Sequence, residues 1–316
     1  MIVTLTANPS LDRTITLTGA LRVGEVQAAE SVREDAGGKG INVTRVVVGS
    51  RGESRAVLPL DADDPFAGLL RAAEVPFEAV PLRGSTRANL TIADPDGVTT
   101  KINLPGVTRS AADAEALIAA TVAAAAGADW LVLAGSLPPG LPAGFYVDVI
   151  AAVRAATATP PRIAVDTSGA ALRAVVENGR PDLIKPNDEE LAELAGVTLD
   201  PDVDLAEAVV AVAASLVPAR VGAAFVTLGS RGAVLVTGDG AWHATPPPTT
   251  VRSTVGAGDS SLAGFLLADV AGESPEGCVR NGIRYGSAAA SLPGTQAPTV
   301  ADFPPGDVPV RALGRP

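Results

Sequence analysis

The sequence predicts an α/β fold in which helices cover both faces of a largely parallel sheet. Two observations support this prediction. Apolar strand signals alternate with helix signals along most of the 316 residues, and such alternation is typical of parallel sheets with crossover helices. Hydrophobic residues also make up 47% of the chain, so it is long and apolar enough for one large α/β domain or two smaller ones.

The predicted elements place several motif loops at one edge of this sheet. Strands are expected at residues 2–6, 54–58, 130–134, 162–165, 183–185, 223–227 and 233–237. Helices are expected at residues 41–48, 65–73, 111–126, 143–156, 189–194, 205–216, 260–271 and 276–290. The loops that hold Asn8, Ser136, Lys185 and Gly229 follow predicted strands. Because ligands of such sheets bind beyond the carboxyl ends of the strands, we expect the functional site there.

Two regions do not follow the alternation. Residues 13–34 and 86–104 contain short strand patterns with polar interruptions, and the turn signal Asp94-Pro95-Asp96-Gly97 lies between two of them. We expect these strands to form a small accessory sheet. The alternative is an edge hairpin that extends the main sheet. The Pro-rich tail from Thr295 onward is expected to pack loosely.

Composition and charge exclude several classes of protein. No apolar run is long enough for a membrane span, the chain starts with a strand pattern and not a signal peptide, and a single cysteine suits a reducing compartment. We therefore expect a cytoplasmic protein that does not bind membranes. A net charge of −11 argues against nonspecific nucleic-acid binding. One histidine and one cysteine argue against a zinc site or a Cys–His pair.

Residues 253–260 read Ser-Thr-Val-Gly-Ala-Gly-Asp-Ser and lead into a predicted helix. Their two glycines let the backbone approach a ligand, and the free N–H groups of the helix would face that ligand. We expect this ligand to be an anion, above all a phosphate. Asp259 would then be placed to accept a proton from an attacking hydroxyl. The alternative is a capped loop without a ligand.

A second glycine cluster, at residues 36–43, reads Ala-Gly-Gly-Lys-Gly-Ile-Asn-Val. Three glycines around one cation suit a loop that wraps a polar, negatively charged small molecule. The cluster is not a Walker P-loop, because Gly40 and not Ser or Thr follows Lys39. Neither cluster has the Gly-x-Gly-x-x-Gly pattern of dinucleotide-binding proteins.

In this order the two clusters resemble the two signatures of the ribokinase-like (PfkB) sugar kinases. Four further segments match family motifs in the expected order, at residues 8–12, 135–140, 185–190 and 227–232. The resemblance covers nearly the whole chain and is strongest to the branch of 1-phosphofructokinases and tagatose-6-phosphate kinases. It implies a three-layer α/β/α fold with a mostly parallel central sheet and a small β-sheet lid. It also implies a single kinase domain over residues 1–316, with lid segments inserted at about 13–34 and 86–104.

The resemblance assigns a catalytic and a sugar-binding set of residues. Asp259 would be the catalytic base, and the backbone of Gly256, Ala257 and Gly258 would stabilise the transferring phosphoryl group. Lys39 would contact the phosphate already on the sugar. The sugar-binding set comprises Asp12, Gly37, Gly38, Lys39, Asn42, Arg87, Asn89, Lys101, Asn103, Ser136 and Asp259. The residues by themselves leave open structural roles, such as loop capping by Asp12, a solvated Lys39 or an exposed strand face around Arg87.

The resemblance also implies ATP and Mg²⁺. The nucleotide side comprises Lys185, Asn187, Glu190, Thr227, Gly229, Ser230 and Gly232, together with Gly256, Ala257 and Gly258. Glu190 would organise Mg²⁺, in part through water, because Mg²⁺ keeps several waters and binds few carboxylates. Asn187 and Glu190 equally match a helix capping box. Residues 227–232 equally match an ordinary glycine turn between two strands.

We therefore expect an ATP-dependent kinase of a phosphorylated ketohexose, with fructose 1-phosphate as the first candidate and fructose 1,6-bisphosphate as its product. Tagatose 6-phosphate and fructose 6-phosphate are the alternatives within the class. A phosphosugar- or nucleotide-binding protein without transfer activity, and a kinase of neutral ribose or nucleosides, are the alternatives outside it. In many relatives the lid carries the dimer contact, so a homodimer through the lid is a further expectation.

Overall fold

The computed structural model describes residues 1–314 and confirms the α/β class, with ten strands in the main sheet. Their order is β14 (Val310–Gly314), β13 (Ala241–Ala244), β12 (Ala233–Thr237), β11 (Ala223–Thr227), β10 (Leu183–Ile184), β9 (Arg162–Asp166), β8 (Trp130–Ala134), β1 (Ile2–Leu5), β4 (Ser54–Leu60) and β5 (Phe77–Pro81). Pairing is parallel from β5 to β11 and antiparallel from β11 to β14. The expected mostly parallel sheet is therefore present.

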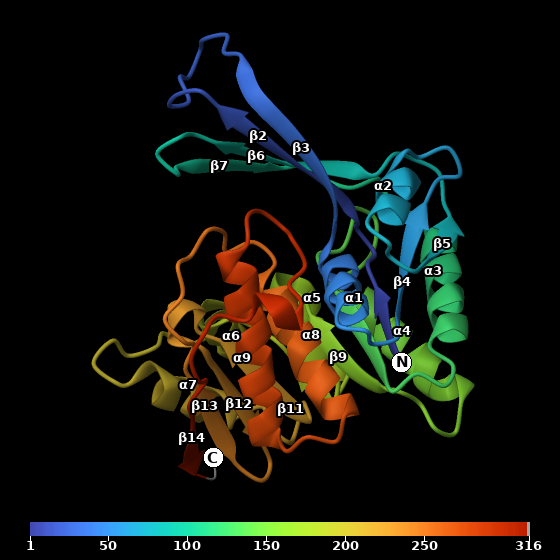
Figure 1. The fold of residues 1–316 in the computed structure, drawn as a ribbon. Helices are drawn as coiled ribbons and strands as arrows, with labels where there is room; N and C mark the ends of the chain where they lie inside the picture. Colours follow the sequence, from blue (N-terminus) through green and yellow to red (C-terminus); the bar gives the residue numbers. More distant parts are fainter. Residues whose placement is uncertain (315–316) are drawn as a thin grey trace.

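Helices cover both faces of this sheet (Figure 1). One layer holds α1 (Lys39–Gly49), α8 (Ala257–Val270) and α9 (Pro275–Ser291), with α2 (Phe66–Ala72) near its edge. The other layer holds α3 (Ala111–Ala124), α4 (Phe145–Ala156), α5 (Gly169–Asn178), α6 (Asp188–Ala195) and α7 (Leu205–Ala213).

Strand β8 shows why the central strands are continuous apolar runs. All five of its residues are buried. Leu131 and Leu133 pack into the core that includes α3 to α7, whereas Trp130, Val132 and Ala134 pack into the core beneath α1, α8 and α9. Because successive side chains of a strand point to opposite faces, a sheet covered on both sides requires apolar residues at every position.

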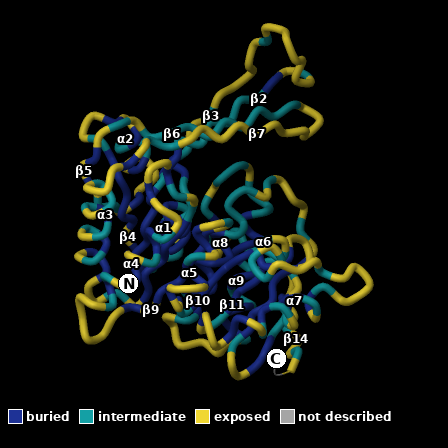
Figure 2. Tube along the Cα trace, turned by 180° about the vertical axis from the view of Figure 1, so that it is seen from behind, coloured by how far each residue is buried: buried dark blue, intermediate teal, exposed yellow. Residues whose placement is uncertain are grey.

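A separate four-stranded sheet has the order β3 (Ala29–Gly37), β2 (Ser10–Leu17), β6 (Arg87–Ala93) and β7 (Thr99–Asn103). It projects from the α/β body above α1 (Figure 1). The alternative of an edge hairpin on the main sheet is therefore wrong. Figure 2 shows that this sheet, which we call the lid, is mostly exposed or half-buried. All five residues of β7 are exposed.

Two expectations about local structure need correction. The tail does not pack loosely, because β14 pairs with β13 and Val308 is buried against the core. Helix α5 also lay outside the predicted elements. Its buried residues, Ala171, Leu172, Val175 and Val176, form one face at helical spacing. No helix within residues 1–314 is long and apolar enough to cross a membrane.

Candidate active site

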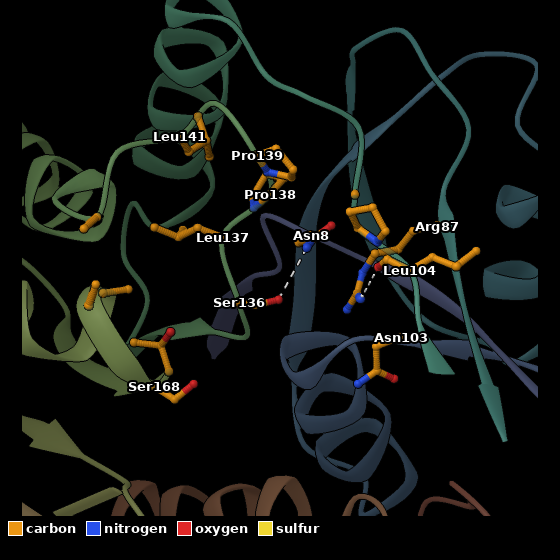
Figure 3. Close-up of a pocket in the computed structure, with 16 residues that line it drawn as sticks. Asn8, Arg87, Asn103, Leu104, Ser136, Leu137, Pro138, Pro139, Leu141 and Ser168 are labelled. Carbon is orange, nitrogen blue, oxygen red and sulfur yellow. Dashed lines mark hydrogen bonds between the residues drawn. The ribbon is translucent and has the colours of Figure 1, made fainter. Parts of the chain in front are cut away.

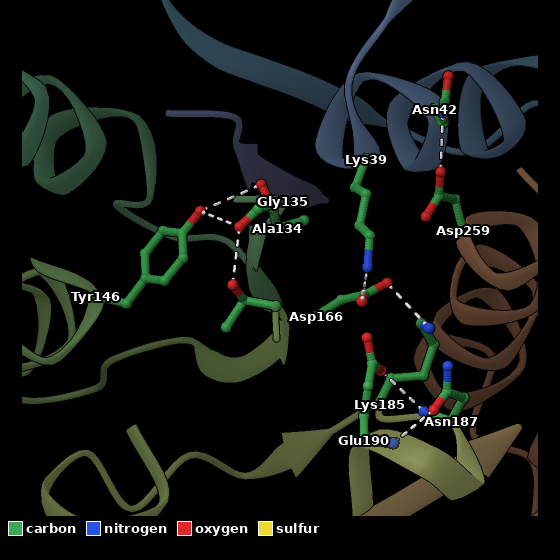
Figure 4. Close-up of polar contacts among 11 residues, drawn as sticks. Lys39, Asn42, Ala134, Gly135, Tyr146, Asp166, Lys185, Asn187, Glu190 and Asp259 are labelled. Atoms are coloured by element: carbon green, nitrogen blue, oxygen red, sulfur yellow. Dashed lines mark hydrogen bonds and ion pairs between the residues drawn. The ribbon is translucent and has the colours of Figure 1, made fainter. Parts of the chain in front are cut away.

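The two glycine clusters lie together in the structure, as the sequence analysis predicts (Figure 4). Asn42, in the first turn of α1, donates a hydrogen bond from Nδ2 to Oδ2 of Asp259, in the first turn of α8, across 2.8 Å. The two residues are 217 positions apart in the chain. Asp259 is 7% exposed, so this contact forms in a largely water-excluded site.

Glycine is required where the two helices begin. Gly38 and Gly256 are the N-cap residues of α1 and α8, with φ angles of 123° and 78°, a region that other residues rarely adopt. At Gly37 a Cβ would lie 2.2 Å from Oδ2 of Asp12. Neither helix has a side-chain cap. The first N–H groups of both helices therefore remain available to an anion.

A buried carboxylate that the sequence analysis missed stands at the centre of the site. Asp166, the last residue of β9, is fully buried and pairs with Lys39 Nζ at 2.7 Å and Lys185 Nζ at 3.1 Å (Figure 4). Burial favours its neutral form, but the two ammonium groups outweigh burial and hold the pKa of Asp166 below its ordinary value. The charge of Asp166 in turn raises the pKa of Lys39 above its usual range, against the opposing effect of burial.

The surroundings of Asp259 shift its pKa toward neutral pH. Burial, and then repulsion from Asp166, raises the pKa of Asp259 to about 6, while Lys39, the hydrogen bond from Asn42 and Lys185 act in the opposite direction. A carboxylate with such a pKa is a competent general base at neutral pH. A Cβ at Gly258 would lie 3.3 Å from Lys185 Nζ, so this ammonium group adjoins the start of α8.

The lid supplies a connected set of polar side chains. Asn89 Nδ2 donates to Oδ1 of Asp12 and to Oγ of Ser10, both at 3.0 Å, and Arg87 Nη1 donates to Oδ1 of Asn89 at 2.9 Å. Burial raises the pKa of Asp12, against the hydrogen bonds from Ser10 and Asn89. Asp12, Asn89 and Asn103 are in register across β2, β6 and β7.

A cavity of about 640 Å³ opens between the lid and the body (Figure 3). Arg87 and Asn103 line it from the lid, and Ser136 and Ser168 line it from the body. Asn8 joins the two sides, because its Nδ2 donates to Ser136 Oγ at 3.3 Å. Asp259 does not line the cavity. The β9–α5 turn connects the cavity with the surroundings of Asp259. Asp166 holds the two lysines, and the next residues, Thr167 and Ser168, line the cavity.

The expected nucleotide motifs also lie together. Asn187 and Glu190 form a capping box at the start of α6, in which Glu190 N donates to Asn187 Oδ1 at 2.7 Å and Asn187 N donates to Glu190 Oε2 at 3.0 Å. Thr227, at the end of β11, donates its N–H to Pro186 O at 3.1 Å. A short 3₁₀ turn, Gly229–Arg231, follows.

Comparison with known proteins identifies the family of this chain. Residues 5–302 match the pfkB family of carbohydrate kinases. The chain belongs to this family. The sequence of this chain is 38% identical to that of a 1-phosphofructokinase of Rhodobacter capsulatus, over 86% of this chain and 84% of the relative. It is 33% identical to the ATP-dependent 6-phosphofructokinase isozyme 2 of Escherichia coli, over 93% of this chain and 94% of the relative.

The fold of this kinase is that of its relatives. A crystal structure of phosphofructokinase-2 from Escherichia coli in complex with substrates and products superposes with a TM-score of 0.86, at 31% identity, and covers 95% of this chain and 96% of the other. The predicted ribokinase-like architecture is confirmed. The protein is therefore a sugar kinase, a phosphotransferase that uses ATP.

Among the predicted sugar-binding residues, three line the cavity, namely Arg87, Asn103 and Ser136. The others do not line it, namely Asp12, Gly37, Gly38, Lys39, Asn42, Asn89, Lys101 and Asp259. The ammonium group of Lys39 contacts Asp166 and does not line the cavity. Lys101 is exposed and in register with Thr91, two pairs further along the lid than Asn103, and it does not line the cavity either. Asp166 could have been found from sequence, because it directly follows the predicted strand 162–165 at the edge where ligands bind.

Proposed function

We propose that this kinase phosphorylates a phosphorylated ketohexose, with fructose 1-phosphate as substrate and fructose 1,6-bisphosphate as product. The relatives named 1-phosphofructokinase, at 31–38% identity, support this substrate. The structural observation that carries the proposal is the placement of Arg87. Arg87 lines the cavity together with Thr167 and Ser168 of the β9–α5 turn, whereas Asp259, at the start of α8, lies near Asp166, the residue directly before them. A sugar anchored by its phosphate at Arg87 would present its far hydroxyl to Asp259.

The proposed transfer uses Asp259 as the base. Asn42 holds one carboxylate oxygen of Asp259, which leaves the other oxygen to accept the proton of the 6-hydroxyl. As the hydroxyl oxygen bonds to the γ-phosphorus of ATP, the bond from that phosphorus to the bridging oxygen breaks and ADP leaves. The free N–H groups of Gly258 and Asp259, at the start of α8, would stabilise the charge of the transferring group.

Lys39 and Lys185 would act on the same group. Both ammonium groups contact Asp166 beside Asp259, so they lie near the site of transfer and not at the resident phosphate of the sugar. We therefore assign Lys39 to the phosphoryl group that is being transferred. Arg87, with Asn103 and Ser136, is assigned to the phosphate that the sugar already carries. Asp12, Asn89 and Asn42 would orient the sugar hydroxyls, and Gly37 and Gly38 would let the backbone approach the sugar.

The nucleotide would lie over Asn187, Thr227, Gly229, Ser230 and Gly232, with its γ-phosphate toward Gly256, Ala257 and Gly258. The residues present suit a Mg²⁺ ion that is bound mainly by ATP phosphates and water. One oxygen of Glu190 caps Asn187, so only its other oxygen is available, and both oxygens of Asp166 face lysines. Mg²⁺ tolerates such a sparse protein contribution. Bound there, Mg²⁺ would neutralise charge on the β- and γ-phosphates.

The same cations suit a phosphate at either end of the sugar. Tagatose 6-phosphate and fructose 6-phosphate, phosphorylated at the 1-hydroxyl, are therefore the second candidates, and the relative named 6-phosphofructokinase isozyme 2 supports them. A binding protein without transfer activity is the alternative of another class. The intact segment from Gly256 to Asp259 argues against it, because its open N–H groups and tuned carboxylate serve transfer and not binding alone.

We further propose that the chain forms a single kinase domain. We also propose that the lid forms the contact of a homodimer. The register of the lid strands puts Val32, Ile15 and Ile92 in one row and Leu90 and Ile102 in another, on the face opposite Asp12 and Asn89. Val32 is 57% exposed and Ile102 is 46% exposed. The lid thus has a polar face toward the cavity and an opposite face that carries these two apolar rows. At the base of that opposite face, Leu11 and Ala36 pack into the core that includes α2, and the ion pair of Arg13 with Glu34 lies in the row of Leu90 and Ile102. We call the two rows the apolar face of the lid. A second copy of the chain would bury that apolar face.

The deciding experiment measures kcat/KM with ATP and Mg²⁺ for fructose 1-phosphate, fructose 6-phosphate, tagatose 6-phosphate, fructose and ribose. We expect the first to be preferred. Asp259→Asn is expected to lower kcat by about 10³-fold while ATP and sugar phosphate still bind. Asp239→Asn, in an exposed turn, is the matched control. Ligand binding without turnover in the wild type would identify a binding protein instead, and preference for a neutral sugar would refute the assignment of Arg87.

A further inference from the structure

Arg109 lies behind the wall of the sugar cavity, directly before the cap of α3. It is only 8% exposed. Its peptide N–H donates to Pro139 O at 2.8 Å, and its Nη1 donates to Arg83 O at 2.9 Å. Arg109 therefore joins two walls of the cavity, the loop that follows Ser136 and the segment that leads to Arg87. The approach is close, since a Cβ at Gly140 would lie 2.1 Å from Arg109 O.

The charge of Arg109 is not compensated by a contacting carboxylate. Its Nε is buried without a hydrogen-bond partner among residues 1–314. The carboxylate of Asp113 acts on it only through its electric field, because Asp113 accepts the N–H of Ser110 at 2.8 Å in the capping box of α3. Burial lowers the pKa of the Arg109 guanidinium. Buried arginines are rare unless they are paired, because an uncompensated buried charge is strongly destabilising.

The nearest cavity cannot supply the missing counter-charge. Arg109 and Arg87 both line a small cavity of about 10 Å³. This volume is about that of one water molecule, which accepts hydrogen bonds but carries no net charge. The cavity of about 640 Å³ shares four wall residues with the small one, namely Asn8, Arg87, Gly106 and Pro138. An anion in the large cavity would therefore lie one layer of side chains away from Arg109.

We propose that Arg109 is a specificity-determining residue for the phosphate that the sugar already carries. Arg87 contacts that phosphate, and Arg109 stabilises it from behind the wall, without touching the substrate, through protein of low dielectric constant. A neutral sugar gains nothing from this field. Arg109 thus favours phosphorylated over neutral sugars. This inference rests on the proposed function, in which the phosphorylated end of the sugar lies in the large cavity.

The test separates the charge of Arg109 from its structural role. Arg109→Lys keeps the charge and loses the planar donor group, whereas Arg109→Gln keeps a donor for Arg83 O and loses the charge. We expect Arg109→Gln to raise KM for fructose 1-phosphate by about tenfold at unchanged kcat, and Arg109→Lys to stay within about twofold of the wild type. KM for ATP should not change in either. The control is Arg154→Gln, because Arg154 also donates to backbone carbonyls, those of Gly179 and Arg180, on another part of the body.

Equal effects of Arg109→Lys and Arg109→Gln, or an unchanged KM in Arg109→Gln, would overturn the inference. Should Arg109→Gln not fold, a comparison of Ser85→Asp with Ser85→Asn tests whether a charge in the small cavity affects binding of the sugar phosphate. Ser85 is exposed and lines that cavity together with Arg109. The carboxylate should raise KM for the sugar phosphate about fivefold and the amide should not; equal KM values would again overturn it. A wild type that does not prefer phosphorylated sugars would refute the proposed function itself, which is a separate result.

Discussion

Asn42 and Asp259 form the contact that joins the two glycine clusters, with Asn42 Nδ2 donating to Asp259 Oδ2 at 2.8 Å. Each residue lies in the first turn of its helix, α1 or α8, and each helix starts at a glycine with positive φ. The bond fixes the carboxylate and stabilises its ionised form. The Oδ1 atom of Asn42 is buried without a partner among residues 1–314, which suits an acceptor for a sugar hydroxyl.

Loss of this contact should weaken catalysis and shift its pH dependence. In Asn42→Ala the hydrogen bond that lowers the pKa of Asp259 disappears, so that pKa should rise above about 6. The base must be ionised to work, and the acid limb of the kcat–pH profile should therefore move to higher pH. We also expect kcat to fall by about 10- to 100-fold. The control is Asn178→Ala, which removes an exposed bond to Ala174 O; an unshifted acid limb would contradict the role of Asn42.

Asp166→Asn should have the opposite effect on the pH profile. Asp166 repels the ionised form of Asp259, so its neutralisation should lower the pKa of Asp259 and move the acid limb to lower pH. The same change leaves Lys39 and Lys185 without their carboxylate. Because Lys185 is 5% exposed, we expect a loss of about 3 kcal/mol in the free energy of unfolding.

Urea unfolding and the kcat–pH profile of Asp166→Asn test both effects. Asp129→Asn is the control, since Asp129 pairs with the amino terminus at the surface and such pairs contribute at most about 1 kcal/mol. Equal stability of the two variants would show that Asp166 does not hold the lysines in solution.

Arg87 and Lys39 should differ in which kinetic constant they control. Arg87→Gln removes the cation that lines the cavity, so KM for the sugar phosphate should rise about 10- to 100-fold, the equivalent of 1.5–3 kcal/mol, with kcat little changed. Lys39→Met removes a cation from beside Asp259, so kcat should fall and KM should change little. Steady-state kinetics with the preferred sugar phosphate check both. The control Arg71→Gln, at an exposed position on α2, should match the wild type. If Lys39→Met raised KM and left kcat unchanged, Lys39 would instead bind the phosphate that the sugar already carries.

Charge on the apolar face of the lid should break the proposed dimer. Val32→Asp and Ile102→Asp each put a carboxylate on that face, and we expect each to convert the dimer to a monomer. Light scattering during size-exclusion chromatography measures the mass directly. Val203→Asp, at a residue that is 44% exposed on the body, is the control. A wild-type monomer at micromolar concentration would exclude the lid as a dimer contact.

The sequence alone predicted those features that depend on local pattern. The apolar runs predict the central strands because a sheet covered on both faces requires apolar residues throughout, as in β8. The glycines of the two clusters predict open helix starts, since positions such as Gly38 and Gly256 adopt positive φ. Asp259 was predicted as the base from its place beside such a start. Other local patterns were missed: helix α5 was not predicted, although its buried face has helical spacing.

Only the tertiary structure decided how distant segments meet. Strand β14 was hidden in a Pro-rich tail, because its pairing with β13 depends on contacts about 70 residues away in the chain and not on local propensity. The partner of Lys39 was equally hidden, since Asp166 lies 127 positions further along. Sequence therefore determines which residues of this kinase carry charge and where its backbone bends. The fold determines which charges face one another, because Coulomb energies depend on distance and burial, and neither quantity is a property of a single segment.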